Sequence, residues 1–267
     1  MRILVCVKQV PDTTEIKIDP VTNTLIRAGV PSILNPFDAY ALEVAARIKD
    51  VTPDTTITLL SMGPEQAKAV LTEGLAVGGD FAYLCSDRKF GGSDTLATSY
   101  ILASAIKQIE AEEGKFDLIM GGKQAIDGDT GQTCVEIASH LGIPQITYAN
   151  EATVDGDEVV VKRESDQGYD MVSAKMPAVV TVNKTAFEPR YPTLRSKMAA
   201  RKKEIKVLTF DDIKEIDVTR CGLKGSPTKV KKTFTPVRNK TCIKLEEEDV
   251  AAAGKKVVNM LVDAKVL

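Results

Sequence analysis

The sequence is poor in the residues that most enzymes use for catalysis. Its 267 residues include no tryptophan and one histidine, His140. His140 is predicted near the C-terminal end of a helix, where free carbonyl groups and the helix dipole account for it. Without a second histidine or a GxSxG turn, a hydrolytic triad has no members. The sequence also lacks the CxxC and HExxH patterns of common zinc sites, so we expect no metal.

The chain also lacks a charge excess and a long apolar run. Lys+Arg 35 against Asp+Glu 37 leaves a formal net charge of -2, which argues against a nucleic-acid partner. No stretch approaches the length of a membrane span, and the first apolar run is too short for a secretory signal. The five cysteines are scattered, which fits neither a disulfide framework nor a zinc site. We therefore expect a globular cytoplasmic protein with no membrane span.

Strands and helices alternate along the first half of the chain. Strands are expected at 3–10, 56–62, 81–85 and 117–120, helices at 35–49, 65–77, 94–113 and 130–141, and a small hairpin at 15–26. This alternation predicts an α/β fold, with a Rossmann-like parallel sheet and helices on both faces. Ligands of such sheets bind beyond the carboxyl ends of the strands.

The second half is richer in strands and ends differently. Strands are expected at 158–163, 170–175 and 178–182, followed by an exposed, proline-broken and basic loop at 188–206 that leads into a short helix. We expect an amphipathic helix at 246–266 that docks either on another surface or on its own domain. We expect an α/β domain over residues 1–220 and a C-terminal arm over residues 221–267.

Two acids, two glycines and a threonine gather at the predicted start of helix 130–141. The glycines at 128 and 131 allow tight backbone geometry, so that amides and hydroxyls of Thr130, Gln132 and Thr133 can face a phosphate. Asp127 and Asp129 would cap the helix or bind sugar hydroxyls. Simple N-capping is the alternative, since turns rich in Asp and Gly are common.

A second glycine loop, FGGSDTLATS (90–99), also precedes a helix. It distantly resembles the SGGxDS phosphate loop of ATP pyrophosphatases. However, it follows the third strand instead of the first, and Phe90 replaces the leading serine. The alternative is that Asp94 acts only as an N-cap.

Five stretches together resemble the beta subunit of electron transfer flavoproteins, in the same order and over nearly the whole chain: VCVKQVPD, LNPFDAYALE, GKQAIDGDTGQ, MPAVVTVN and EPRYPTLRSKMAARKK. The resemblance implies a heterodimer in which the arm embraces an alpha subunit. In the ordinary branch the beta subunit holds AMP, and the positions that match its pocket are Cys6, Asn35, Met62, Gly122 and Asp127, Gly128, Asp129, Thr130, Gly131, Gln132 and Thr133.

The form DGDTGQ, together with FGGSDTLATS, is similar to the electron-bifurcating branch. There the same pocket accepts a second FAD, which takes hydride from NADH, and Thr95 and Thr98 are the implied contacts near the flavin or nicotinamide. Few catalytic side chains are expected, because the flavin carries the chemistry.

The loop 187–206 matches the family's recognition loop, which implies that Leu194 inserts into an acyl-CoA dehydrogenase or a related CoA-linked dehydrogenase. Basic residues surround this anchor: Arg190, Arg195, Lys197 and Arg201. The resemblance thus implies electron transfer from NADH to ferredoxin and to such a dehydrogenase. The alternatives are a non-bifurcating carrier with AMP, and a stand-alone adenine-nucleotide-binding module or pyrophosphatase.

Overall fold

The computed structural model describes residues 1–12, 31–231, 242–245 and 249–267. Contacts divide the chain into two compact units, Met1–Lys17 with Leu25–Lys231, and Ile18–Thr24 with Lys232–Leu267. Residues 221–231 are part of the first of these units. In the second unit helix α7 (Val250–Asp263) begins after Asp249, whose side chain accepts a hydrogen bond from the Ala251 amide.

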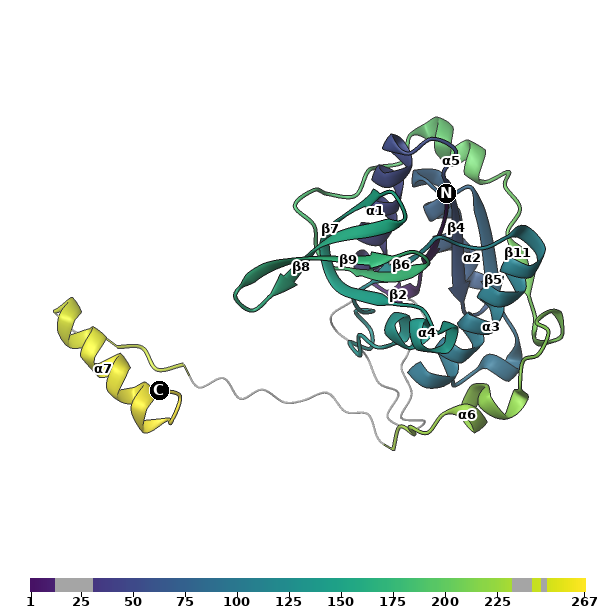
Figure 1. Ribbon diagram of the computed structural model, residues 1–267. Coiled ribbons are helices and arrows are strands. Elements are labelled where there is room, and N and C mark those ends of the chain that lie inside the picture. The colour runs from purple at the N-terminus through teal and green to yellow at the C-terminus, as the bar shows by residue number, and fades with distance from the viewer. Residues whose placement is uncertain (13–30, 232–241, 246–248) are drawn as a thin grey trace. The chain divides into compact units, whose positions relative to one another are not determined.

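The first unit contains strands and helices in alternation (Figure 1). The strands are β1 (Arg2–Cys6), β2 (Gln9–Pro11), β3 (Ser32–Leu34), β4 (Thr56–Met62), β5 (Phe81–Cys85), β6 (Leu118–Gly122), β7 (Gln145–Asp155), β8 (Glu158–Ser165), β9 (Gly168–Lys175), β10 (Ala178–Val182) and β11 (Lys206–Leu208). The helices are α1 (Pro36–Val51), α2 (Lys68–Val77), α3 (Thr95–Glu113), α4 (Thr133–Leu141), α5 (Leu194–Ala200) and α6 (Gly222–Gly225), with short 3-10 helices η1 (Glu65–Ala67), η2 (Arg88–Phe90), η3 (Phe210–Asp212) and η4 (Val218–Arg220).

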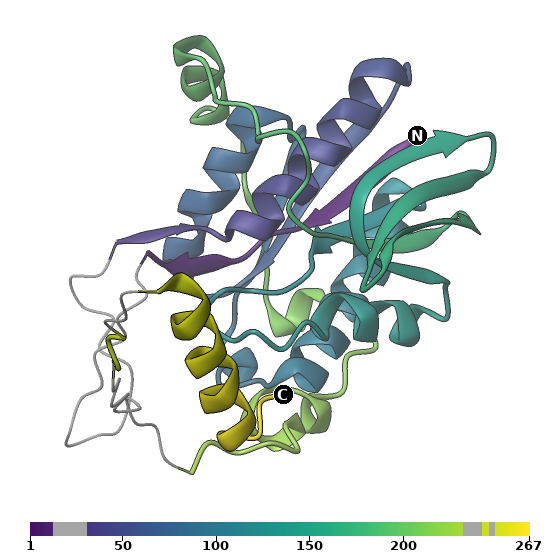
Figure 2. The ribbon, with the colours of Figure 1, turned by 90° about the vertical axis from the view of Figure 1, so that its left-hand side faces the viewer.

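The main sheet has nine strands in the order β11-β5-β4-β1-β6-β10-β7-β8-β9. Neighbours from β11 to β7 run parallel, whereas β8 and β9 continue antiparallel at one edge (Figure 2). The predicted α/β fold with a parallel sheet is confirmed. Strands 56–62, 81–85 and 178–182 match their predicted bounds, because each is a compact apolar run between turn residues.

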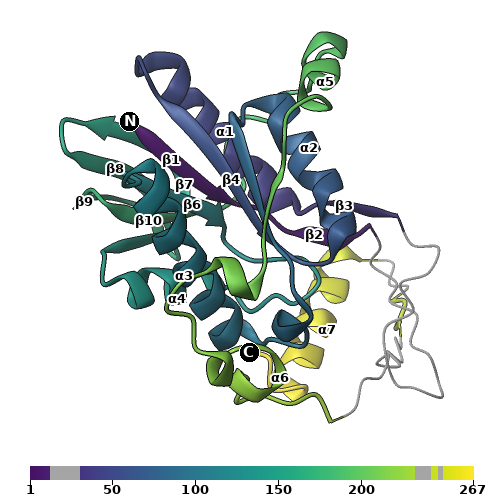
Figure 3. The same cartoon turned by 90° about the vertical axis from the view of Figure 1, so that its right-hand side faces the viewer.

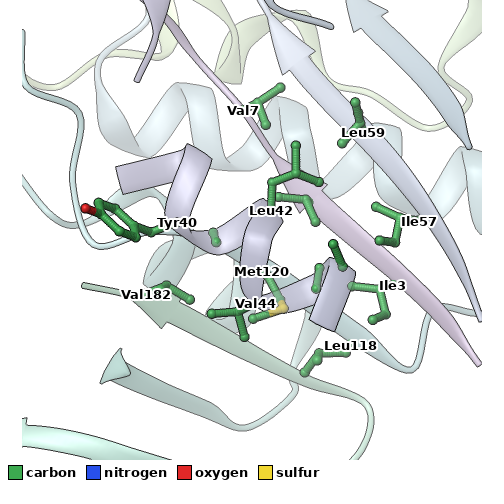
Figure 4. Close-up of a cluster of buried hydrophobic side chains, with 14 of the residues drawn as sticks. Ile3, Val7, Tyr40, Leu42, Val44, Ile57, Leu59, Leu118, Met120 and Val182 are labelled. Carbon is green, nitrogen blue, oxygen red and sulfur yellow. The ribbon is translucent and has the colours of Figure 1, made fainter. Parts of the chain in front are cut away.

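Helices cover both faces of the sheet (Figure 3). One core lies under α1 and α2, where Leu42 and Val44 of α1 pack against Ile3 and other sheet residues (Figure 4). The other core lies under α3 and α4 and includes Ile106 and Ile137. Parallel strands buried on both faces are continuous apolar runs, which is why the sequence predicted them well.

Other expectations need correction. The run 3–10 is not one strand, because β1 ends at Cys6 and residues 9–11 form β2, which pairs with β3 in a separate two-stranded sheet. Strand β7 was not predicted at all. The expected hairpin at 15–26 lies outside the described residues.

Candidate functional site

The carboxyl ends of β1, β4 and β6 and the starts of α3 and α4 enclose a cavity of about 370 Å3. This volume is within the range of small-molecule sites, roughly 300–1,000 Å3. Strand β1 pairs with β4 on one side and with β6 on the other, so the cavity lies where the direction of strand order reverses. In open parallel sheets this reversal opens a crevice between neighbouring strand ends, and ligands bind there.

Most of the residues predicted to bind a cofactor are brought together here. Those that line the cavity are Cys6, Met62, Thr95, Thr98, Gly122, Gly128, Thr130, Gly131, Gln132 and Thr133. Three predicted residues, Asn35, Asp127 and Asp129, do not line it. The other lining residues are Val7, Lys8, Asp38, Leu60, Ser61, Ser93, Asp94, Leu102, Lys123, Gln124, Ala125 and Cys134.

Asp38 joins the two strand ends at the base of the cavity. Its Oδ2 accepts a hydrogen bond from the Lys8 amide at 2.8 Å, and its Oδ1 accepts one from the Gly122 amide at 3.0 Å. Burial raises the pKa of Asp38 to about 7, although hydrogen bonds from Asn35, Lys8 and Gly122 favour the charged form. The base of the cavity thus contains a carboxyl group that titrates near neutral pH.

Gly122 is required by packing in addition to any ligand. A Cβ at this position would lie 2.5 Å from the Cβ of Phe37 and 2.6 Å from the Asp38 carboxylate. Asn35, which is fully buried, donates from Nδ2 to the Gln124 carbonyl at 2.9 Å and accepts from the Ile126 amide at 3.2 Å. The start of α1 therefore supports strand β6 and the loop that follows it.

The loop before α4 differs from the prediction. The helix begins at Thr133 and not at residue 130, because Asp129 (φ 53°) and Gly131 (φ 65°) have left-handed backbone conformations that interrupt a helix. A Cβ at Gly128 would meet no atom within 4 Å. The N-cap residue Gln132 makes no side-chain capping hydrogen bond. The first amides of α4 are thus left without a side-chain cap from Gln132, next to the cavity.

The two acids of this loop do not cap α4, which corrects one of the two roles predicted for them. Asp127 accepts a hydrogen bond from Lys8 Nζ at 2.7 Å, and this ion pair connects the end of β1 to the loop. Asp129 accepts from Gln124 Nε2 at 2.7 Å. Both carboxylates stabilise the conformation of the loop that forms one wall of the cavity.

The second glycine loop also forms part of the wall. Asp94 caps α3, with Oδ1 accepting from the Ala97 amide at 3.1 Å, as the simpler alternative predicted. Thr95 follows and donates to Glu136 Oε1 at 3.3 Å. Gly92 has φ 77°, and a Cβ there would lie 2.6 Å from Leu223 Cγ. This glycine therefore serves packing against Leu223, whose side chain fills the space beside it.

Two cavity side chains are neutral. The neighbouring thiol of Cys134 and burial raise the pKa of Cys6 well above its ordinary value, so Cys6 presents an uncharged thiol. Ser61 is 1% exposed, and its hydroxyl has no hydrogen-bond partner among the described residues. A buried hydroxyl without a partner in the wall of a cavity is suited to contact a ligand.

His140 lies in the last turn of α4, as predicted, but its explanation changes. Burial, followed by the charge of Arg220, lowers the pKa of the imidazole, which favours the uncharged ring. The ring packs edge-on against Tyr100, with ring centroids 5.9 Å apart. In the described part of the chain, no three His, Cys, Asp or Glu side chains gather to hold a metal ion.

The family model for the electron transfer flavoprotein domain matches residues 22–213. The electron transfer flavoprotein subunit beta of Megasphaera elsdenii is 54% identical over 271 residues and covers 100% of both chains. The chain belongs to the beta-subunit family of electron transfer flavoproteins. It is also similar to the subunit CarD of the caffeyl-CoA reductase-Etf complex of Acetobacterium woodii, 47% identical over 88% of each chain. Protein FixA of Azorhizobium caulinodans is 42% identical over 88% of this chain and 85% of that protein.

Membership of the electron transfer flavoprotein family directs attention to the loop that the sequence predicted as a partner contact. Leu194 is the first residue of α5 and is 77% exposed, and Tyr191 and Met198 are exposed beside it. Arg190 is not part of a free basic rim, which corrects the prediction. Its guanidinium pairs with Glu43 at 2.8 Å and with Asp50 at 2.7 Å.

These ion pairs anchor the loop of this flavoprotein subunit to α1. Tyr40 adds a hydrogen bond to Glu188 at 3.0 Å, and Arg47 stacks 3.7 Å above the ring of Phe187. A rigid base under an exposed leucine lowers the entropy that is lost when a partner binds.

Sequence reasoning missed Asp38, Ser61 and Lys123 as site residues. Asp38 stands in the quoted LNPFDAYALE stretch, and its position in the first turn of a helix that follows a strand end was a usable signal. Ser61 precedes Met62, so it was one residue from a predicted contact. Lys123 directly follows Gly122 and gave no separate signal.

Proposed function

We propose that this chain is the beta subunit of an electron transfer flavoprotein heterodimer that binds FAD in the cavity. With an alpha subunit it takes electrons from NADH and passes them by bifurcation to ferredoxin and to a CoA-linked dehydrogenase. The single observation that carries this proposal is the cavity itself. It joins a helix start without a side-chain cap to hydroxyl groups and apolar walls, and its described lining includes no histidine.

The residues of the cavity fit an adenine nucleotide. Main-chain amides at the start of α4 and the hydroxyls of Thr130 and Thr133 provide donors for phosphate oxygens. Lys123 adds positive charge to the lining, whereas the charge of Lys8 is paired with Asp127. Leu60 and Leu102 provide apolar surface for a flat ring.

The polar groups have separate tasks in this proposal. Asp38 holds the ends of β1 and β6 in place, so the donors are positioned before the cofactor binds. Ser61 supplies one further hydrogen bond from β4. The flavin, when bound, accepts hydride or electrons, and the chain binds it, orients it and excludes water.

The choice of FAD over AMP rests on the residues around the two glycine loops and on the names of relatives. Thr95 and Thr98 lie in the cavity wall together with Gln132, so both glycine loops border one cavity, which supports a ligand larger than AMP. One relative is named for a caffeyl-CoA reductase-Etf complex and another as an acryloyl-CoA reductase electron transfer subunit. These names support a CoA-linked partner.

The experiment is to denature the purified heterodimer and quantify the released nucleotides. Two FAD per heterodimer are expected. One FAD with one AMP would instead support the non-bifurcating carrier, in which AMP fills the same cavity. Stopped-flow bleaching of the flavin by NADH would complete the test.

A stand-alone nucleotide-binding module or pyrophosphatase is the alternative of another class. The loop 90–99 resembles a pyrophosphatase phosphate loop. However, Leu223 fills the space beside Gly92, where such a loop would approach a phosphate, and this counts against that function. ATP turnover by the chain without a flavin-containing partner would support it.

We place the protein in the cytoplasm, because all five cysteines are free thiols. Among the described residues, no helix is both long enough and apolar enough to cross a membrane. In the second unit, helix α7 (Val250–Asp263) is the proposed contact to the alpha subunit.

Leu194 tests the proposed contact with the dehydrogenase. Leu194→Ala should slow dehydrogenase-linked electron transfer about thirtyfold at limiting partner concentration, because an interface anchor contributes about 2 kcal/mol. Bound nucleotide should be unchanged. Val51→Ala removes a similarly exposed aliphatic side chain at the end of α1 and is the control. Equal transfer rates for the two variants would refute the anchor role.

A further inference from the structure

The segment from Gly222 to Thr228 is hydrogen-bonded to the glycine loop ahead of α3. The Gly222 amide donates to Ser93 Oγ at 3.0 Å, and the Asp94 amide donates to Ser226 Oγ at 2.8 Å. Thr228 donates to Asp94 Oδ2 from its amide at 3.0 Å and from its hydroxyl at 2.7 Å. These bonds of Ser93 and Asp94 are called the clasp below.

Asp94 uses its two carboxylate oxygens for two different elements. Oδ1 caps α3 at the Ala97 amide, and Oδ2 accepts both bonds from Thr228. Burial opposes ionisation, but the hydrogen bonds from Thr228 and Ala97 lower the pKa of Asp94 below its ordinary value. The clasp is therefore charge-assisted at neutral pH, and such bonds are stronger than neutral ones.

The two segments are also closely packed. A Cβ at Gly222 (φ 60°) would lie 2.4 Å from the Lys89 carbonyl oxygen, and Leu223 fills the space beside Gly92. Ser226 is 5% exposed. Gly92 and Gly222 are therefore both required to be glycine, because the segment and the loop pack too closely for a Cβ at either position.

The loop and the first turn of α3 form one wall of the cavity. Ser93, Asp94, Thr95 and Thr98 all line it, whereas Thr228 does not. We propose that the clasp positions the first turn of α3 against the bound nucleotide, so that Thr228 controls nucleotide affinity without touching the nucleotide. This inference rests on the proposed function of the cavity.

The position of the clasp in the chain gives it a further consequence. Thr228 lies three residues before Lys231, where the first compact unit ends. Coupling between sites is reciprocal, so a nucleotide that stabilises the first turn of α3 also stabilises the attachment of residues 222–228. Nucleotide binding and the anchoring of the chain that leads into residues 232–267 are then linked.

The test compares two matched variants of the full chain in the complex that it forms. Thr228→Val removes the hydroxyl bond to Asp94 and keeps the β-branched shape. Thr219→Val removes a bond of the same kind, from Thr219 to Asp217 at 2.7 Å, and neither residue lines the cavity. Affinities for FAD and for AMP are measured by calorimetry on nucleotide-free protein. Amide hydrogen exchange is measured at residues 95–99 and 222–231, with and without nucleotide.

We expect Thr228→Val to weaken nucleotide binding about fivefold and to speed exchange at residues 95–99, while Thr219→Val changes neither. In the unmodified chain, nucleotide should slow exchange at residues 222–231. Equal nucleotide affinity and equal amide exchange at residues 95–99 in the two variants would overturn the proposal that Thr228 positions the first turn of α3. If the unmodified chain binds neither nucleotide, the proposed function fails, and exchange at residues 95–99 alone still decides whether Thr228 positions the first turn of α3.

Discussion

The two glycine loops look alike in the sequence and are built for different purposes. Both bring glycine and aspartate together just before a helix. Both loops border the cavity, but in the loop before α4 the space beside Gly128 is open. In the loop before α3, the space beside Gly92 is filled by Leu223.

The difference shows that glycine can be required next to a helix start for more than one physical reason. An open space is available to a ligand, whereas a filled one marks close packing between segments. The sequence alone does not distinguish them, because the packing partner at residue 223 lies 131 positions away from Gly92 in the chain. The following predictions test this contrast, from the largest expected effect to the smallest.

Gly222→Ala tests the close packing between residues 222–228 and the loop before α3. The added Cβ would approach the Lys89 carbonyl at 2.4 Å in a left-handed conformation, and the backbone cannot move aside cheaply. We expect the free energy of unfolding to fall by about 3 kcal/mol in urea titrations. Gly128→Ala, on the open side, should change it by less than about 0.5 kcal/mol. Similar losses for both would remove the distinction between the loops.

The two sides should also differ in their response to pH, because Asp38 and Asp94 have pKa values shifted in opposite directions. The folded pKa of Asp38 is raised to about 7 from 3.8, so the folded state binds more protons between these values, and stability falls as pH rises through this window. From pH 5 to pH 7 the loss should be about 2 kcal/mol. The pKa of Asp94 is lowered, so its contribution is present above its ordinary value and is lost only as the pH falls below it.

Urea titrations at several pH values, with Asp38→Asn as the comparison, measure this effect. Asn does not titrate, so the slope of stability against pH between 5 and 7 should flatten in that variant. An unchanged slope would show that Asp38 does not titrate in this window.

The smallest effect is expected for Ser61→Ala, which removes the hydroxyl that lacks a partner. Nucleotide affinity should fall about fivefold, the equivalent of about 1 kcal/mol, with little change in thermal stability. Ser104 bonds the Tyr100 carbonyl within α3, so Ser104→Ala is a control that alters no cavity residue. Unchanged affinity of Ser61→Ala would exclude a direct contact.

The sequence predicted the parallel sheet well and the local turns less well. Strands β4 and β5 were found because buried apolar runs are a strong signal. Strand β7 was missed because its burial is irregular and Tyr148 has φ 58°, which breaks the alternation. The start of α4 was placed three residues early, because the positive φ of Asp129 is a property of the folded loop and its bonds.

The site was predicted in outline for a topological reason. Parallel strands end at one edge, so Cys6, Met62 and Gly122 had to meet there. The tasks of the polar residues were not predictable in the same way. Whether Asp127 caps a helix or pairs with Lys8 depends on a contact across 119 positions of the chain.

One carboxylate at the base of the cavity has a consequence for how such a site changes over time. Asp38 joins the ends of β1 and β6 through main-chain amides of the chain itself, so this contact needs no ligand. Asp38, which supports the base of the cavity, and the loop that forms its wall are therefore separate parts of the site. We expect substitutions in the loop 124–133 to change which ligand the proposed site selects, while Asp38 keeps the two strand ends in place.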